Sequence, residues 1–462
     1  ISPCVAESDV DVKATRFPKS EVLGDIFSLA VNKQLAVAEI PGTEYGYFDT
    51  LAPQIEDVRR RYIARKLATN AMDFDDLLVL WLRLLTDHAE VREHYQRRFQ
   101  FILVDEYQDT NKLQSDLIDL LAARHHNVMV VGDDAQSIYA WRGANFQNIL
   151  KFPDRYPGAK IYKIETNYRS TPEILTVANA AIAANVQQFA KQLAPARTSG
   201  ARPVLVACQD AAQQAAFVAQ RALELREEGG ALNNMAVLYR SHFHALELQL
   251  ELTRRNIPFS ITSGIRFFEQ AHIKDVTAYL KLVLNPRDEL AFKRLAQLLP
   301  GVGGKGADKL WKVFTPGLAA RNSGQKTATP LAAALQACAQ HAPKKATLAW
   351  AQFATTVSQL EDKSVRTSAA RMIPIVIEAG YDDYLKANFA NSRSRLDDLK
   401  QLAIFAQQFS TVDEFLTQMA LLTNVEAEDD QQPANRDGEK MRLSTIHQAK
   451  GLEFDVVFVI ML

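Results

Sequence analysis

Two adjacent carboxylates, Asp105 and Glu106, stand directly after a short apolar run, 101–104, in the stretch RFQFILVDEYQDT. The run is typical of a buried β-strand, so the two acids are expected at its carboxyl end. One carboxylate in such a place can hold Mg²⁺, usually through water, while its neighbour accepts a proton from an attacking water molecule. This pairing suits the hydrolysis of a nucleoside triphosphate.

The same stretch also fits a structural role. Asp109 and Thr110 can cap the helix that follows, and acids near a helix start are favoured by its dipole. The usual partner of a catalytic pair is a glycine-rich phosphate loop, GxxxxGK[ST], and the sequence contains no such string. The nearest string, GVGGKGADKL at 301–310, has no Ser or Thr after Lys305 and follows no strand. The acids are therefore either structural or belong to a chain without its phosphate loop.

The elements that would position these acids follow a strand, helix, strand pattern. Residues 101–104 and the run NVMVVGDD at 127–134 are strand-like, and 111–126 between them carries leucines on one helical stripe. Continuous apolar strands around an amphipathic helix predict a parallel sheet covered on both faces. Ligands of such sheets bind beyond the carboxyl ends of the strands, where Asp133 and Asp134 join the first pair of acids.

A second set of strand and helix signals follows. Strands are predicted for KIYKI at 160–164, PVLVAC at 203–208 and MAVLYR at 235–240, and a helix is predicted to open at 170–172. PARTSGARP, at 195–203, is typical of a surface loop.

Helical patterns dominate two other regions. The chain after Pro53 carries apolar residues at helical spacing, with an interruption near Asn70, and 268–425 is almost wholly helical in pattern. The stretch 426–440 is polar and predicts an exposed linker, after which 441–460 returns to strand character.

Composition excludes some classes of protein. The 462 residues indicate about three domains, and a net charge of −1 means that any nucleic-acid site must be local. Cys4, Cys208 and Cys338 show no CxxC spacing, which argues against a disulfide framework or zinc site and favours a reducing, intracellular setting. The longest apolar run, 456–462, is far below the ~20 residues that span a bilayer, so we expect a soluble protein without a membrane partner.

Three longer stretches favour the catalytic interpretation. They are VGDDAQSIYAWRGA (131–144), ETNYRST (165–171) and STIHQAKGLEF (444–454). Together with DEYQDT they resemble motifs II, III, IV and V of the superfamily 1 DNA helicases of the UvrD/Rep/PcrA group, which are P-loop NTPases. LYRS (238–241), with 256–275, resembles that family's second core segment, and DFDDLL (73–78) resembles the end of its first insertion. The resemblance runs in family order along the whole chain.

The resemblance implies an α/β fold with two RecA-like parallel-sheet cores, both incomplete, and two α-helical insertion subdomains. The implied borders are 1–98 for the helical insertion of the first core, 99–165 for the partial first core, 166–265 for the first part of the second core, 266–435 for the helical insertion subdomain and 436–462 for the return segment of the second core. We further expect an internal fragment, without the N-terminal Walker A segment and the C-terminal motif VI, that by itself is inactive as an ATPase.

The resemblance also assigns nucleotide contacts, with ATP and Mg²⁺ as cofactors. Asp105 would organise the metal, with Glu106 beside it positioning or deprotonating the hydrolytic water. Gln136 would contact the γ-phosphate, and Arg169 would act as an arginine finger from the second core. The other implied contacts are Tyr168, stacked on the adenine, and Glu453, at the ribose.

For DNA, exposed aromatic side chains accept any base, so Tyr139 and Trp141, with Arg142 beside them, suit binding of single-stranded DNA. The alternative is that both aromatics belong to the core. The resemblance adds three contacts on the second core, Arg240, Thr445 and His447. His447 taken alone fits an interior histidine equally well.

The helical subdomain carries one further candidate. The glycine-bracketed hairpin 298–314 either presents backbone N–H groups to a phosphate of duplex DNA or is an ordinary turn between helices, with Gly301 ending one and Asp308 or a neighbour beginning the next.

The expected function is that of an ATP-dependent DNA helicase or translocase, moving 3′ to 5′ on single-stranded DNA by resemblance, in repair or replication. Expected partners are single-stranded and duplex-junction DNA and other repair or replication proteins, for a cytoplasmic, nucleoid-associated bacterial protein that is a monomer or weak dimer. Two alternatives stay open: a non-catalytic DNA-binding or scaffold module, and a helicase subunit of a RecB-like helicase-nuclease.

Overall fold

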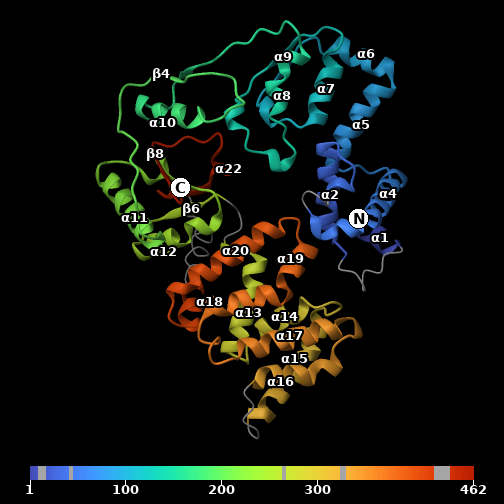
Figure 1. Cartoon of the computed structure of the whole chain (residues 1–462), viewed down its shortest axis with the longest axis vertical. Helices are drawn as coiled ribbons and strands as arrows, with labels where there is room; N and C mark the ends of the chain where they lie inside the picture. The colour runs from blue at the N-terminus through green and yellow to red at the C-terminus, as the bar shows by residue number, and fades with distance from the viewer. Residues whose placement is uncertain (9–16, 41–44, 263–266, 323–328, 421–437) are drawn as a thin grey trace. The chain divides into compact units, whose positions relative to one another are not determined.

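The computed structural model describes residues 1–8, 17–40, 45–262, 267–322, 329–420 and 438–462. They form two compact units, Ile1–Val206 and Ala207–Leu462 (Figure 1). Most of the predicted linker 426–440 lies outside the described residues. The first unit includes 166–206, which the resemblance gave to the second core, and the predicted domain borders stay predictions.

The first unit is mainly helical. Its helices are α1 (Ser2–Ala6), α2 (Ser20–Lys33), α4 (Ala52–Ala68), α5 (Phe74–Asp87), α6 (Ala89–Arg98), α7 (Lys112–Ala122), α8 (Gln147–Leu150), α9 (Phe152–Arg155) and α10 (Pro172–Ile182). The predicted interruption near Asn70 is confirmed, because that residue is left-handed (φ 50°) between α4 and α5. Asp73 then opens α5: it accepts the Asp76 N–H at 2.9 Å and donates its own N–H to the Asp76 carboxylate at 3.0 Å.

Helix α7 decides one of the open alternatives. Its N-cap is Asn111, whose side chain accepts the Gln114 N–H at 2.8 Å while its own N–H donates to the Gln114 side chain at 2.9 Å. The proposal that Asp109 or Thr110 caps this helix is therefore wrong. Leu117 and Leu121 of α7 pack with Leu85 of α5, and Figure 1 shows α5, α6 and α7 grouped together.

The predicted strands on either side of α7 are confirmed. β1 (Ile102–Val104) pairs in parallel with β2 (Val128–Val130), with Ile102 opposite Val128 and Val104 opposite Val130. A second, very short parallel pair joins β3 (Thr166–Asn167) to β4 (Ala194–Pro195).

Two predicted strands, at 160–164 and 203–208, are wrong. Both segments lack regular structure, and within the described ranges no strand pairs with either of them. Tyr162 and Leu205 are 81% and 85% exposed. An apolar, strand-like sequence forms a ladder only where a neighbouring strand satisfies its backbone, and such a neighbour is missing from the part of the chain that is described.

The second unit contains a four-stranded parallel sheet in the order β6-β7-β5-β8. The strands are β5 (Met235–Tyr239), β6 (Phe259–Ile261), β7 (Met441–Thr445) and β8 (Val456–Val459). The buried face of this sheet packs against α11 (Ala211–Glu227) and α12 (Leu246–Arg254) through Val218, Leu248 and Leu252.

The remainder of the second unit is the predicted helical region. Its helices are α13 (Ala271–Leu284), α14 (Glu289–Gln297), α15 (Gly304–Asn322), α16 (Pro330–Cys338), α17 (Thr347–Leu360), α18 (Ala369–Val376), α19 (Asp382–Asn388) and α20 (Ser392–Phe405), with a π-helical turn at Ile377–Tyr381. Two apolar clusters hold them together, one around Phe415 and Leu399 and one around Trp350 and Phe292. Among the described residues, no helix combines the length and the apolar composition that a membrane crossing needs.

The architecture is thus α/β, mostly helical with small parallel sheets, as predicted.

Candidate functional site

Asp105 and Glu106 lie at the carboxyl edge of the small sheet in the first unit. They follow β1 directly, and both are exposed. The ladder continues past the acids, since Val131 N–H donates to Val104 O at 2.8 Å and Tyr107 N–H donates to Val131 O at 3.0 Å. Asp133 and Asp134, which come shortly after β2, therefore emerge at the same edge as the first pair of acids.

The chain makes a sharp turn at Glu106. This residue is left-handed, with φ 50° and ψ 40°, and its N–H donates to Asp105 Oδ1 at 2.8 Å. A non-glycine residue in this region costs roughly 1–3 kcal/mol and persists only where surrounding contacts hold it. The turn leads into a 3-10 helix, η2 (Tyr107–Asp109), whose Tyr107 side chain is fully buried beneath the edge.

One residue at this edge escaped the sequence analysis. Gln108 is fully buried and contacts both strand ends: its Nε2 donates to Glu106 Oε2 at 2.6 Å, and its Oε1 accepts the Asp133 N–H at 3.0 Å. A buried glutamine beside two strand ends is visible only in the folded chain, although its place within DEYQDT was a signal.

Asp133 lies at the centre of a second cluster. Its carboxylate accepts from Gln136 Nε2 at 2.8 Å and from the Ala135 N–H at 3.0 Å, and it also pairs with Lys191. Burial would raise the pKa of Asp133, but the hydrogen bonds from Lys191 and Gln136 outweigh burial and hold that pKa below its ordinary value. Lys191 also lies 3.6 Å from Asp134. No motif in the sequence pointed to Lys191, which lies 58 residues from Asp133.

The aromatic residues of the following stretch are accessible to different degrees. Trp141, in a 3-10 helix (η4, Ala140–Arg142), is 60% exposed, whereas Tyr139 is half-buried. The alternative that Trp141 belongs to the core is therefore wrong. The side chain of Arg142 is not described. Gly143 closes the turn at φ 89°, where an added Cβ would come within 2.9 Å of Asn32 Cβ.

Tyr168 and Arg169 follow the short strand β3 in the same unit. Both side chains are exposed, Tyr168 to 78%. Asn167 Oδ1 accepts the N–H of Arg169 at 3.0 Å and that of Ser170 at 2.8 Å, which shapes the turn before α10. Arg197 donates to the Arg169 carbonyl at 2.9 Å.

In the second unit, three predicted DNA contacts come together at the carboxyl edge of the sheet. Arg240 follows β5, Thr445 ends β7 opposite Tyr239, and His447 lies in the short helix α22 (Ile446–Ala449). Arg240 Nη1 lies 3.4 Å from His447 Nδ1. Thr445 is buried and Arg240 is exposed.

Glu453 is not part of that group. It is exposed and precedes β8, and two residues later the Asp455 N–H donates to Asn234 O at 2.9 Å. Asn234 immediately precedes β5, so this stretch of chain runs along the amino-terminal edge of the sheet.

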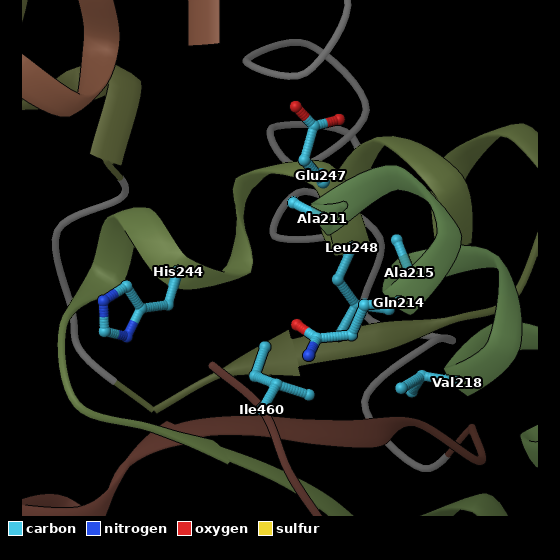
Figure 2. Close-up of a pocket in the computed structure, with 8 residues that line it drawn as sticks. All are labelled: Ala211, Gln214, Ala215, Val218, His244, Glu247, Leu248 and Ile460. Atoms are coloured by element: carbon cyan, nitrogen blue, oxygen red, sulfur yellow. The ribbon is translucent and has the colours of Figure 1, made fainter. Parts of the chain in front are cut away.

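A shallow depression also lies at the sheet of the second unit (Figure 2). It is lined by Ala211, Gln214, Ala215, Val218, His244, Glu247, Leu248 and Ile460. It has no room for a bound water molecule, and Figure 2 shows the Glu247 carboxylate pointing away from Gln214 and Ile460. Burial raises the pKa of Glu247 and outweighs the hydrogen bond from Gln408, which acts in the opposite direction. Burial lowers the pKa of His244. We interpret the depression as a packing seam.

The sequence of this chain matches two models of known protein families. Residues 4–157 match the UvrD/REP helicase N-terminal domain, and residues 162–462 match the UvrD-like helicase C-terminal domain. The chain belongs to the UvrD-like helicase family.

The chain also has similar relatives that are named as helicases of this family. The chain is 32% identical over 468 residues to the "ATP-dependent DNA helicase PcrA" of Bacillus subtilis (strain 168), an alignment that covers 99% of this chain and 61% of the relative. It is also 32% identical over 407 residues to the protein of the same name from Staphylococcus aureus (strain NCTC 8325 / PS 47), covering 86% of this chain and 54% of the relative. The chain thus spans little more than half the length of these relatives.

The donor set of this UvrD-like chain fits the cofactors that the family implies. Mg²⁺ prefers carboxylate oxygens, water and phosphate oxygens, and Asp105 and Glu106 offer exposed carboxylates at a sheet edge. Among the described residues, no group of three or more acids, histidines or cysteines is arranged to hold a metal by itself.

The hairpin between α14 and α15 keeps both of its interpretations. Gly301 is left-handed at φ 76°, and α15 begins at Gly304, before Asp308. Asp308 instead pairs with Lys293 at 2.5 Å. Added Cβ atoms at Gly303 and Gly304 would meet open space, so these glycines leave the helix start accessible.

Proposed function

We propose that the full-length product of this gene is an ATP-dependent DNA helicase and translocase, and that its hydrolytic residues lie on the carboxyl edge of β1 and β2. The single observation that supports this most is a chain of hydrogen bonds along that edge. It runs from Glu106 through Gln108 and Asp133 to Gln136, with distances of 2.6, 3.0 and 2.8 Å. The alternative of isolated helix caps would not need the two strand ends to be connected.

In this proposal Asp105 and Glu106 hold Mg²⁺, which when bound would neutralise charge on the phosphates of ATP. Glu106 orients the hydrolytic water and accepts its proton on a carboxylate oxygen. Gln136 donates its amide to the terminal phosphate. The Gln136 amide nitrogen carries two N–H donors, so it can donate to the phosphate while it keeps its bond to Asp133.

The remaining nucleotide contacts rest on the family resemblance and on exposure. Tyr168 offers an exposed ring to the adenine, and the exposed guanidinium of Arg169 is proposed to stabilise charge on the transferred phosphoryl group. Glu453 is proposed to bind the ribose.

Two surfaces are proposed for DNA. In the first unit, Trp141 presents most of its ring to solvent and stacks on a base, with Tyr139 and Arg142 beside it. In the second unit, Arg240 and His447 bind the strand, with Thr445 beneath them.

We further propose 3′ to 5′ movement, a role in repair or replication alongside other proteins of those processes, and a cytoplasmic, nucleoid-associated setting as a monomer or weak dimer. All of these rest on the resemblance. Unwinding of a duplex with a 3′ tail, compared with the same duplex carrying a 5′ tail, tests the polarity: faster unwinding from the 5′ tail would refute it.

Substitution of the proposed base tests the function. In the full-length gene product, Glu106→Gln is expected to abolish DNA-stimulated ATP hydrolysis while leaving the affinity for single-stranded DNA within about threefold of wild type, since the amide cannot accept a proton. Glu90→Gln, an exposed acid on α6, is the matched control and should retain full hydrolysis. Hydrolysis that survives in Glu106→Gln would refute the role proposed for Glu106, and absence of hydrolysis from the wild-type protein would support the scaffold alternative.

A further inference from the structure

Gln108 is the residue that connects the two strand ends. It is fully buried, so both halves of its side-chain amide need hydrogen-bond partners within the protein. Nε2 finds Glu106 Oε2 at 2.6 Å, and Oε1 finds the Asp133 N–H at 3.0 Å. These two partners follow different strands, β1 and β2.

The chemistry of these partners fixes which way the amide points. A carboxylate at Glu106 only accepts hydrogen bonds, and the Asp133 N–H only donates. Rotating the amide by 180° would therefore lose both bonds, which removes the usual ambiguity between glutamine oxygen and nitrogen. Of the twenty side chains, glutamine alone has this length together with one donor and one acceptor in a single rigid amide.

The backbone leaves space for this side chain at Gly132. A Cβ added there would lie 2.5 Å from Gln108 Oε1 and 2.7 Å from Ile149 Cδ1. The absence of a side chain at residue 132 is thus what allows the Gln108 amide to reach the backbone that follows β2.

We infer that Gln108 is a positioning residue for hydrolysis: it holds the Glu106 carboxylate in register with the Asp133–Gln136 turn. This inference rests on the proposed function of Glu106 and Gln136 and adds the element that sets their spacing. Glu106 is exposed on a left-handed turn, and the Gln108 amide is the contact that connects its carboxylate to the backbone after β2. Loss of the amide lets the carboxylate move, and a displacement of about 1 Å can cost roughly 10²-fold in rate.

The test uses three variants of the full-length gene product. Gln108→Met keeps the length of the side chain and removes both hydrogen bonds. Gln108→Glu keeps an acceptor for the Asp133 N–H and sets a second carboxyl against Glu106, where the two either share a proton or repel, so that the Glu106 carboxylate is disturbed in both cases. Gln96→Met is the matched control, since Gln96 is also buried and also donates one short hydrogen bond, 2.7 Å to Leu120 O, which joins α6 to α7 and does not involve the carboxyl ends of β1 and β2.

For Gln108→Met and Gln108→Glu we expect kcat for DNA-stimulated ATP hydrolysis to fall roughly 10- to 100-fold, with KM for ATP within about threefold of wild type. If the role of Gln108 were purely structural, Gln108→Met and Gln96→Met would lower the melting temperature and the active fraction of the protein to the same extent. The Glu106→Asp background provides the decisive comparison, because its shortened carboxylate no longer reaches Gln108. There, adding Gln108→Met should change kcat less than about threefold.

Full kcat in both Gln108 variants would overturn the inference, as would losses for Gln108→Met and Glu106→Asp that multiply in the double variant. If Gln108→Met does not fold, Gln108→Glu decides, since it leaves the Asp133 N–H bonded. Absence of ATP hydrolysis from the wild-type protein would instead refute the proposed function itself, before any variant is compared.

Discussion

Replacement of Trp141 by alanine should weaken binding of single-stranded DNA and leave folding nearly unchanged. The ring is 60% exposed, so its removal opens no cavity in the core. Loss of one stacked base costs about 1–3 kcal/mol, which corresponds to an increase in Kd of about 5- to 150-fold. The 462-residue chain contains Trp141 and is the sample for this test.

The assay is fluorescence anisotropy of a labelled oligothymidylate titrated with protein at one fixed salt concentration, because phosphate contacts make the affinity salt-dependent. Phe74→Ala is the matched control, since Phe74 is an aromatic residue that is 90% exposed and lies outside the proposed DNA surface. Thermal melting of both variants should stay close to wild type. Equal Kd values for Trp141→Ala and Phe74→Ala would show that Trp141 does not stack on DNA.

Three further predictions concern stability and turnover. Tyr381→Phe should lower the free energy of unfolding of the second unit by about 1.5–3 kcal/mol in urea denaturation, because the Tyr381 hydroxyl donates to the buried Asp275 carboxylate at 2.6 Å; an unchanged midpoint would contradict this. Burial raises the pKa of Asp133, but the hydrogen bonds from Lys191 and Gln136 outweigh burial and lower this pKa in the folded protein. The lowered pKa adds stability that is present at neutral pH and is lost as the pH falls below about 4. Lys191→Met should thus be less stable than wild type at pH 7 and differ less from it at pH 3, and an equal difference at both pH values would argue against this pairing. The 462-residue chain, whose sequence contains no GxxxxGK[ST] string, should release negligible phosphate from ATP in a malachite-green assay with single-stranded DNA, and robust turnover would refute this.

Local sequence signals predicted the elements that depend on local physics. The break between α4 and α5, the strand β1 before the tandem acids and the helix after Thr171 all follow from periodicity and capping. The strands predicted at 160–164 and 203–208 failed, since a strand depends on a neighbour that its own sequence cannot specify.

The candidate site divides in the same way. The sequence by itself determined the chemical types at the strand ends, Asp105, Glu106 and Gln136, because the motifs that carry them are contiguous. Only the tertiary structure decided that Gln108 joins two strands and that Lys191 pairs with Asp133 from 58 residues away. The physical reason is that a hydrogen bond or ion pair depends on distances of a few ångströms in space, and a chain reveals these only after its strands and helices have packed.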